Sequence, residues 1–365
     1  MTFRHQLAPL RLGDLLLRNH IVMAPCTRCR CPGFLPTAEV AAYYARRAAD
    51  GVGLLISEGT VVCERGNGYN GAPGIWTDDQ VRAWRPVTEA VHEAEGLIIC
   101  QLWHVGAVAH PLTTGGVAPE SPSGLHPPGA VSRLRDEAGA PIPFGPSEAM
   151  DEERIREVVR LFGDAAGRAL EAGFDGVEIH GAHGYLIDQF INLKWNHRTD
   201  DWGGDQRCRL AGEVTRTVLA ETGPGRTLLR FSPGWGTPGS GWQRPAETLP
   251  LLLDTLWEAG LRLLHASHGS YDEGFLPAAA LPIAHPLHNH DTLVPLHLAT
   301  RARWPGQVVG VGGLSPARAE SALAADEIDA AAFGRALIAN PDLVSRIKMG
   351  IELREYDQSM LDRLV

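Results

Sequence analysis

Several features that would define a protein class are missing from this chain of 365 residues. It has no apolar run of the roughly 18 residues that a membrane span needs. It also has no sustained basic run, and its formal net charge is −10. We therefore expect neither a membrane protein nor a partner of nucleic acid or anionic membranes. Charges interrupt every apolar stretch of residues 1–20, so no signal peptide is indicated and we expect a soluble cytoplasmic protein.

Cysteine is scarce as well, with six residues that make no disulfide framework. Cys26, Cys29 and Cys31 form a C-x-x-C-x-C cluster, but no fourth ligand accompanies them. We interpret them as small thiols and keep a metal site as the alternative. No G-x-G-x-x-G follows the early strands, so a Rossmann-bound dinucleotide is not indicated.

Glycine and proline, in contrast, are plentiful, with 41 and 26 residues spread along the chain. This distribution is typical of many tight turns on one compact body. Hydrophobic residues make up 44% and charged residues 21%, the composition of a globular domain with a large core.

Eight short apolar runs, each with the length of a buried strand, alternate with longer helical stretches. The predicted strands are 20–25, 52–58, 97–103, 175–180, 227–232, 261–266, 307–311 and 328–333. The predicted helices are 37–49, 78–95, 151–172, 207–221, 245–259, 293–302, 315–324 and 336–347. Eight such units predict an α/β fold, a single (β/α)8 TIM barrel domain over residues 1–365. Long loops, 59–77 and 105–150, follow strands 2 and 3 on the face where barrels place active sites.

The fourth predicted strand ends in His180-Gly-Ala-His183-Gly-Tyr185, which we expect to form a turn entering a helix. Two imidazoles and a phenol in this pattern can bind a carbonyl or anionic oxygen and supply a proton. Metal binding by the two histidines and a purely structural role stay open as alternatives. The third ligand and the helical H-E-x-x-H spacing of a zinc site are absent.

Two glycine-containing pairs follow the last two strands: Gly312-Gly313 and Gly334-Arg335, the latter at a predicted helix start. Late barrel strands often bind phosphate through exposed backbone N–H groups, and Arg335 adds a bidentate donor. Ordinary turn glycines are the alternative. Arg230 lies within a strand predicted to be buried, and it therefore needs a ligand or an acidic partner.

Several stretches carry a resemblance to a known family over nearly the whole chain. They include NHIVMAP at 19–25, QLWH at 101–104, AGFDGVEIHGAHGYLIDQF at 172–190, VGVGG at 309–313 and AFGRALIANPD at 332–342. In this order they resemble the Old Yellow Enzyme family of FMN-dependent ene-reductases. The resemblance implies noncovalently bound FMN in the barrel mouth, reduced by NAD(P)H. The reduced flavin would pass hydride to the β-carbon of an α,β-unsaturated carbonyl or nitro compound.

The resemblance also assigns roles by position. Tyr185 would donate the proton to the α-carbon, while His180 and His183 would hold the substrate oxygen. Tyr69 and Trp103 would wall the substrate pocket. The implied cofactor contacts are Pro25, Thr27, Gly59, Gln101, Arg230, Gly312, Gly313, Gly334 and Arg335. Arg230 would stabilise the negative charge that reduction places on the flavin.

Some positions depart from the family pattern. Ala107 stands where an arginine is common, and residues 270–291 match nothing in the family. The three histidines of that segment, at 285, 288 and 290, suggest a solvated or pocket-edge loop rather than a metal tract. Cys26 adjoins a position that some branches use to tune the flavin, and we interpret it as a bystander behind the strand.

Three other functions compete with ene-reduction. One is a flavin-dependent dehydrogenase running in the oxidising direction on the same fold. Another is a metal-dependent barrel lyase or hydrolase that uses His180 and His183. A third is a catalytically silent binding protein. No metal is expected, and a homo-oligomer is possible.

Overall fold

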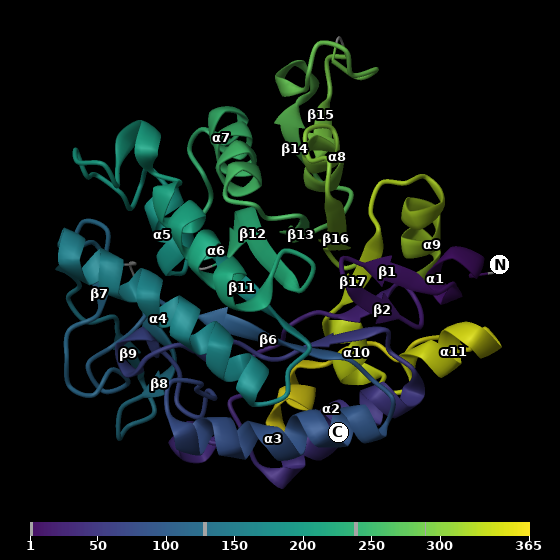
Figure 1. Cartoon of the computed structure of the whole chain (residues 1–365), viewed down its shortest axis with the longest axis horizontal. Coiled ribbons are helices and arrows are strands. Elements are labelled where there is room, and N and C mark those ends of the chain that lie inside the picture. The colour runs from purple at the N-terminus through teal and green to yellow at the C-terminus, as the bar shows by residue number, and fades with distance from the viewer. Residues whose placement is uncertain (1–2, 127–129, 237–239, 289) are drawn as a thin grey trace.

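The computed structural model describes residues 3–126, 130–236, 240–288 and 290–365. Its centre is a closed barrel of eight parallel strands, which confirms the predicted (β/α)8 fold (Figure 1). In spatial order the barrel strands are β3 (Ile21–Met23), β4 (Leu54–Ile56), β6 (Ile98–Trp103), β11 (Gly176–His183), β12 (Thr227–Gly236), β13 (Leu263–Ser267), β16 (Gln307–Val311) and β17 (Ala330–Phe333). Pairing of β17 with β3 closes the ring.

Helices surround the barrel, one or more after each strand. They are α2 (Ala38–Asp50), α3 (Asp78–Glu93), α4 (Glu152–Glu171), α5 (Leu186–Ile191), α6 (Arg209–Thr222), α7 (Pro245–Glu258), α8 (Leu296–Arg301), α9 (Pro316–Ala324), α10 (Arg335–Ala339) and α11 (Leu343–Met349). Capping side chains begin several of them. Thr77 and Gln80 form a reciprocal capping box at α3, and the Asp151 side chain accepts from the Arg154 N–H at α4.

Alternation along the strands places one set of side chains inside the barrel. Ile99, Leu228 and Leu263 belong to one buried cluster with residues of the other strands. The β1–β2 hairpin (Leu10–Leu12 and Leu15–Leu17) adds Leu12, Leu15 and Leu17 to the same cluster, and we did not predict this hairpin. Two residues further along the same strands the interior becomes polar, with Gln101, Arg230 and His265. The polar residues therefore lie toward the carboxyl ends of the strands.

Several predicted boundaries were wrong, three of them because of the presence or extent of another element. The predicted helix 336–347 is two helices, α10 and α11, because Pro341 lacks an N–H and disfavours a helical residue before it. The predicted helix 293–302 begins only at Leu296, after a short strand. The predicted turn from His180 is still strand, because β11 continues to His183 before α5 begins.

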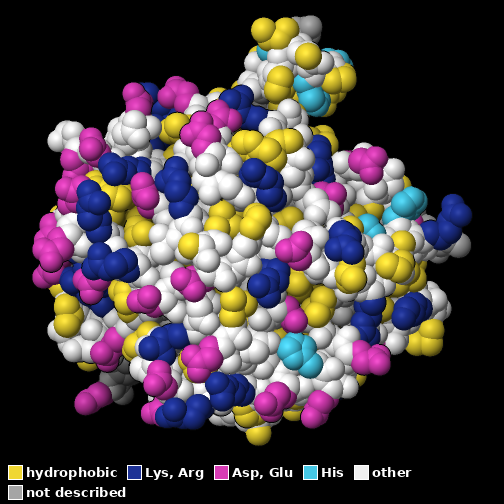
Figure 2. Space-filling view, viewed as in Figure 1, with side chains coloured by type: hydrophobic (Ala, Val, Ile, Leu, Met, Phe, Trp, Pro, Cys, Tyr) yellow, Lys and Arg dark blue, Asp and Glu magenta, His cyan; other side chains and the backbone are white. Residues whose placement is uncertain are grey.

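The segment that matched nothing in the family forms an excursion from the barrel. Strands β14 (Gly274–Pro277) and β15 (Leu293–Pro295) pair antiparallel and project from the body together with α8 (Figure 1). Figure 2 shows hydrophobic and histidine side chains on this projection, and Ile283 there is 85% exposed.

The two long loops carry small elements of their own. The loop after β4 contains β5 (Thr60–Val61), and the loop after β6 contains β7 (Glu120–Ser121) and β10 (Glu148–Ala149). The latter loop also contains β8 (Ala130–Arg135) and β9 (Pro141–Pro143). Within the described ranges, no helix is long and apolar enough to cross a membrane.

Candidate active site

A cavity of about 360 Å³ opens at the carboxyl ends of the strands. Most of the predicted site residues line it: Pro25, Thr27, Gln101, His180, His183, Tyr185, Arg230, Gly312, Gly313, Gly334 and Arg335. Residues from seven of the eight strands, or from the turns that follow them, thus meet in one space. Gly59, Tyr69 and Trp103 are outside this lining set, among the residues that the structure describes.

We call four side chains on four neighbouring strands the polar layer: Gln101, Glu178, Arg230 and His265. Hydrogen bonds join Glu178 to Gln101 and to His265, and the charge of Glu178 acts on Arg230. The Gln101 Nε2 donates to Glu178 Oε1 at 2.8 Å, and His265 Nδ1 lies 2.6 Å from Glu178 Oε2. Glu178 and His265 are fully buried. Burial lowers the pKa of His265 despite the nearby Glu178 charge.

Arg230 has the acidic neighbour that its burial requires, since Glu178 is the main charge favouring its guanidinium. Its Nη2 also donates to Ser267 Oγ at 3.1 Å. Its Nε is buried and, among the described residues, has no hydrogen-bond partner. A buried orphan donor costs about 1–3 kcal/mol, so this atom indicates a missing acceptor.

His180 and His183 are held as neutral imidazoles. Burial, followed by the positive charge of Arg230, lowers the pKa of both well below the usual value. The Ala182 N–H donates to His180 Nδ1 at 3.3 Å, which leaves the proton of that ring on Nε2. His183 Nε2 lies 3.2 Å from Ser267 Oγ. Its own backbone has φ +63°, a left-handed conformation that is rare for residues other than glycine.

Three rings, which we call the aromatic wall, stand beside the histidines: Tyr69, Trp103 and Tyr185. The Tyr69 and Tyr185 hydroxyl groups are 3.0 Å apart. The Trp103 ring stacks on Tyr69 and meets Tyr185 edge-on, with centroids 5.1 and 5.0 Å away. A side chain at Gly59 would lie 2.6 Å from the Trp103 ring, so glycine is required for this packing.

The late-strand glycines leave backbone exposed to the cavity. A Cβ on Gly312 would lie 2.6 Å from the backbone nitrogen of Tyr271, so no side chain fits there. Gly313 has φ +71°. Arg335, at the first position of α10, lines the same end of the cavity. Exposed backbone and a guanidinium are a donor set that suits a phosphate group.

Sequence reasoning missed some of the lining and misjudged one part of it. Ser267 and His268 line the cavity, and neither was predicted. We interpreted Cys26 as a bystander, but it lines the cavity together with Thr27. The chain makes an irregular turn after β3, so successive residues reach the same space without strand alternation. Burial raises the pKa of the Cys26 thiol.

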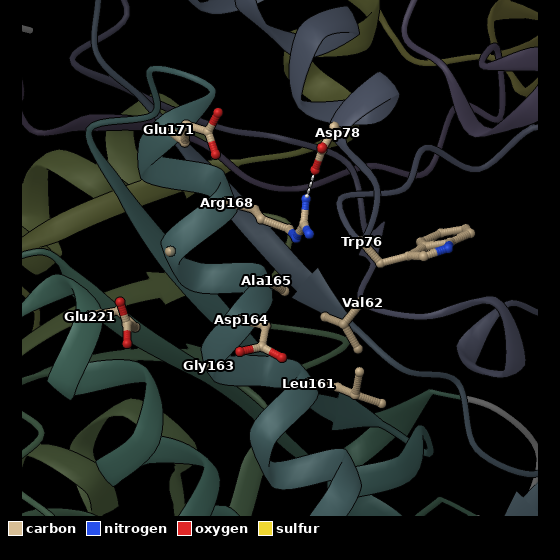
Figure 3. A pocket seen from close by; sticks show the side chains of 11 residues that line it. Val62, Trp76, Asp78, Leu161, Gly163, Asp164, Ala165, Arg168, Glu171 and Glu221 are labelled. Carbon is tan, nitrogen blue, oxygen red and sulfur yellow. Dashed lines mark hydrogen bonds and ion pairs between the residues drawn. The ribbon is translucent and has the colours of Figure 1, made fainter.

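A second hollow, of about 570 Å³, lies on the outer helical layer (Figure 3). It is lined by Val62, Trp76 and residues of α4, and an ion pair joins Arg168 to Asp78. None of the predicted site residues lines it. In the described parts of the chain, no group of three or more His, Cys, Asp or Glu side chains could hold a metal ion.

The comparisons with known proteins agree with one another. Residues 6–354 match the model of the NADH:flavin oxidoreductase / NADH oxidase family. The chain is 35% identical to 12-oxophytodienoate reductase 2 of Arabidopsis thaliana, covering 97% of this chain and 91% of that one. It is 38% identical to the flavin oxidoreductase hxnT of Emericella nidulans, covering 96% and 92%.

Solved structures give the same result. The Old Yellow Enzyme homologue of Zymomonas mobilis superposes with a TM-score of 0.86 at 34% identity, covering 98% of this chain and 96% of that one. Morphinone reductase in complex with tetrahydroNAD superposes with a TM-score of 0.85 at 35% identity, covering 98% and 93%. The chain therefore belongs to the Old Yellow Enzyme family of NADH:flavin oxidoreductases, which are NAD(P)H-dependent enzymes with FMN as their cofactor.

Proposed function

We propose that the enzyme reduces the activated C=C bond of α,β-unsaturated carbonyl or nitro compounds. The observation that carries this proposal is the combination of two neutral histidines and a tyrosine hydroxyl at one side of the cavity. FMN held in this cavity would supply the hydride chemistry that links NAD(P)H to the alkene. The family relationship, and the name of the relative 12-oxophytodienoate reductase 2, support the same function.

The residues that would hold FMN are those that the sequence predicted. Gln101 and Arg230 would contact the pyrimidine edge of the flavin. The Arg230 Nε lacks a hydrogen-bond partner among the described residues, and a flavin acceptor would supply one. Pro25, Thr27 and Gly59 would contact the ring. The phosphate would lie against the Gly312, Gly313, Gly334 and Arg335 group.

The substrate oxygen would accept hydrogen bonds from His180 and His183. Neutral imidazoles suit this role because they donate a hydrogen bond without adding a charge that would compete with Arg230. His180 has the correct tautomer, with its proton on Nε2. Such bonds draw electron density toward the oxygen and so make the β-carbon a better hydride acceptor.

Tyr185 would supply the proton to the α-carbon. Its hydroxyl is 3.0 Å from the Tyr69 hydroxyl, and its ring makes edge contacts with the Trp103 and His180 rings. Tyr69 and Trp103 would close the wall of the substrate pocket. The cytoplasm, with its supply of reduced nicotinamides, is the compartment that we propose for this reaction.

An anaerobic stopped-flow experiment tests the proposal. The purified enzyme should show flavin absorbance that NADPH or NADH bleaches and that 2-cyclohexenone or a nitroalkene restores. Bleaching without recovery on any activated alkene would contradict ene-reduction and would favour a dehydrogenase. Absence of flavin absorbance after reconstitution with FMN would contradict the cofactor site itself.

A further inference from the structure

The polar layer contains two ionisable groups that the proposed reaction does not use, Glu178 and His265, and Glu178 is the acidic one. Glu178 lies on β11 beneath the cavity, is fully buried, and belongs to no part of the cavity lining that the structure describes. A buried carboxyl group is costly unless it is paired and hydrogen-bonded, so its presence inside the barrel needs an explanation.

Each carboxylate oxygen of Glu178 has one hydrogen-bond partner. Oε1 accepts from the Gln101 side-chain amide, and Oε2 lies 2.6 Å from His265 Nδ1. The hydrogen bond to Glu178 fixes the orientation of the Gln101 side-chain amide. If the amide flipped, its oxygen would face the Glu178 oxygen, and two acceptors would be in contact. Glu178 thereby determines which atoms Gln101 offers to the cavity.

Glu178 also affects the cavity through its negative charge. Arg230 is the cation nearest the proposed flavin edge, and Glu178 is the main negative charge acting on it. His265 adds no charge, because burial favours its neutral form. The field at the cavity floor is therefore the sum of one cation and one anion in a region of low dielectric constant.

We propose that Glu178 is a positioning residue for the cofactor: it orients Gln101 toward the flavin, and its negative charge lowers the reduction potential of bound FMN. The inference rests on the proposed FMN orientation, with Gln101 and Arg230 at the pyrimidine edge. Two-electron reduction adds negative charge to that edge, and an anion in the next layer opposes it.

Three substitutions separate the two effects. Glu178→Gln removes the charge and keeps an acceptor for Gln101, while His265 can change tautomer to suit the new amide. Glu178→Asp keeps the charge and withdraws the acceptor by one methylene. Glu171→Gln is the matched control, because Glu171 is a 61% exposed carboxylate on α4 that pairs with Arg85.

The midpoint potential of the FMN-loaded enzymes is measured by dye equilibration without substrate, and the FMN dissociation constant by fluorescence titration. We expect Glu178→Gln to favour reduction about tenfold, which is about 30 mV for a two-electron couple, with little change in FMN affinity. We expect Glu178→Asp to weaken FMN binding about tenfold, as loss of one hydrogen bond would, without moving the potential. Glu171→Gln should change neither.

An unchanged or lowered potential in Glu178→Gln would overturn the electrostatic role. Unchanged FMN affinity in Glu178→Asp would overturn the positioning role, and this variant remains informative if Glu178→Gln does not fold. Both measurements need only bound flavin. A failure to reduce any alkene would therefore contradict the proposed function and leave this test intact.

Discussion

The polar layer and the aromatic wall both contribute residues to the same cavity lining, Gln101 and Arg230 from the first and Tyr185 from the second, but they are supported differently. The polar layer lies on four adjacent barrel strands, where each side chain is fixed by its neighbours across the sheet. The aromatic wall takes Tyr69 from the loop after β5 and Tyr185 from the turn before α5, and only Trp103 from a strand. We infer that the strands set the cofactor's electrostatics and that the loops set substrate binding.

The largest expected effect belongs to the aromatic wall. Tyr185→Phe should slow flavin reoxidation by 2-cyclohexenone about 10²–10⁴-fold, because it removes the general acid. Flavin reduction by NADPH should be unaffected, and stopped-flow traces of the two half-reactions check this. Tyr69→Phe removes only the partner of the Tyr185 hydroxyl and should cost about tenfold or less. Equal slowing of both half-reactions in Tyr185→Phe would show that the wall also serves the cofactor.

A comparable effect on stability is expected in the polar layer. Arg230→Met leaves the buried Glu178 without its cation and should lower the free energy of unfolding by about 3–5 kcal/mol. FMN should be lost on purification. The double variant Arg230→Met/Glu178→Gln should recover much of the stability, and urea unfolding measures both. If the double variant were no more stable than Arg230→Met, the Arg230 and Glu178 charges would not stabilise each other.

The pH dependence of stability gives a somewhat smaller effect. The pKa values of His180 and His183 are lowered in the folded state, so the unfolded chain binds protons first as the pH falls. The contribution of these two histidines to stability should therefore be constant above about pH 7.5 and decline below about 6.5, by up to about 1.4 kcal/mol per pH unit for each histidine. Urea unfolding between pH 8 and 5 measures the slope. His180→Asn should make the slope of stability against pH shallower. An unchanged slope would contradict the lowered pKa of His180 in the folded state.

The smallest effect concerns the C-terminal segment. The buried Arg28, next to the cavity residue Thr27, donates to the backbone oxygens of Met360 and Arg363 at 3.0 and 2.7 Å. Deleting residues 358–365 should leave this guanidinium short of acceptors and cost about 1–3 kcal/mol. Calorimetry of the FMN-loaded enzyme measures the loss. An unchanged transition temperature would show that this segment does not support the cavity.

Much of this arrangement could be predicted from the sequence. A barrel brings strand ends together in chain order, so His180, Arg230, Gly312 and Gly334 had to converge once eight strands were recognised. The interruption between α10 and α11 was also marked in the sequence, by Pro341.

What could not be predicted depends on contacts between strands. The pairing of Glu178 with Gln101 and His265 follows from the stagger of the barrel, which no single strand reveals. Ser267 was missed for the same reason, since its importance comes from bonds to Arg230 and His183 on two other strands. The β14–β15 hairpin lacks the alternating pattern that would have marked its strands.

Isotope transfer tests the central claim most directly. Activated alkene is reduced with the enzyme and NADPH deuterated at the transferred position, and the product is examined by NMR. We predict one deuterium at the β-carbon and, for reactions run in D2O with unlabelled NADPH, one solvent deuterium at the α-carbon. A saturated product without nicotinamide deuterium, or no saturated product at all, would contradict the assignment of this cavity to flavin-mediated alkene reduction.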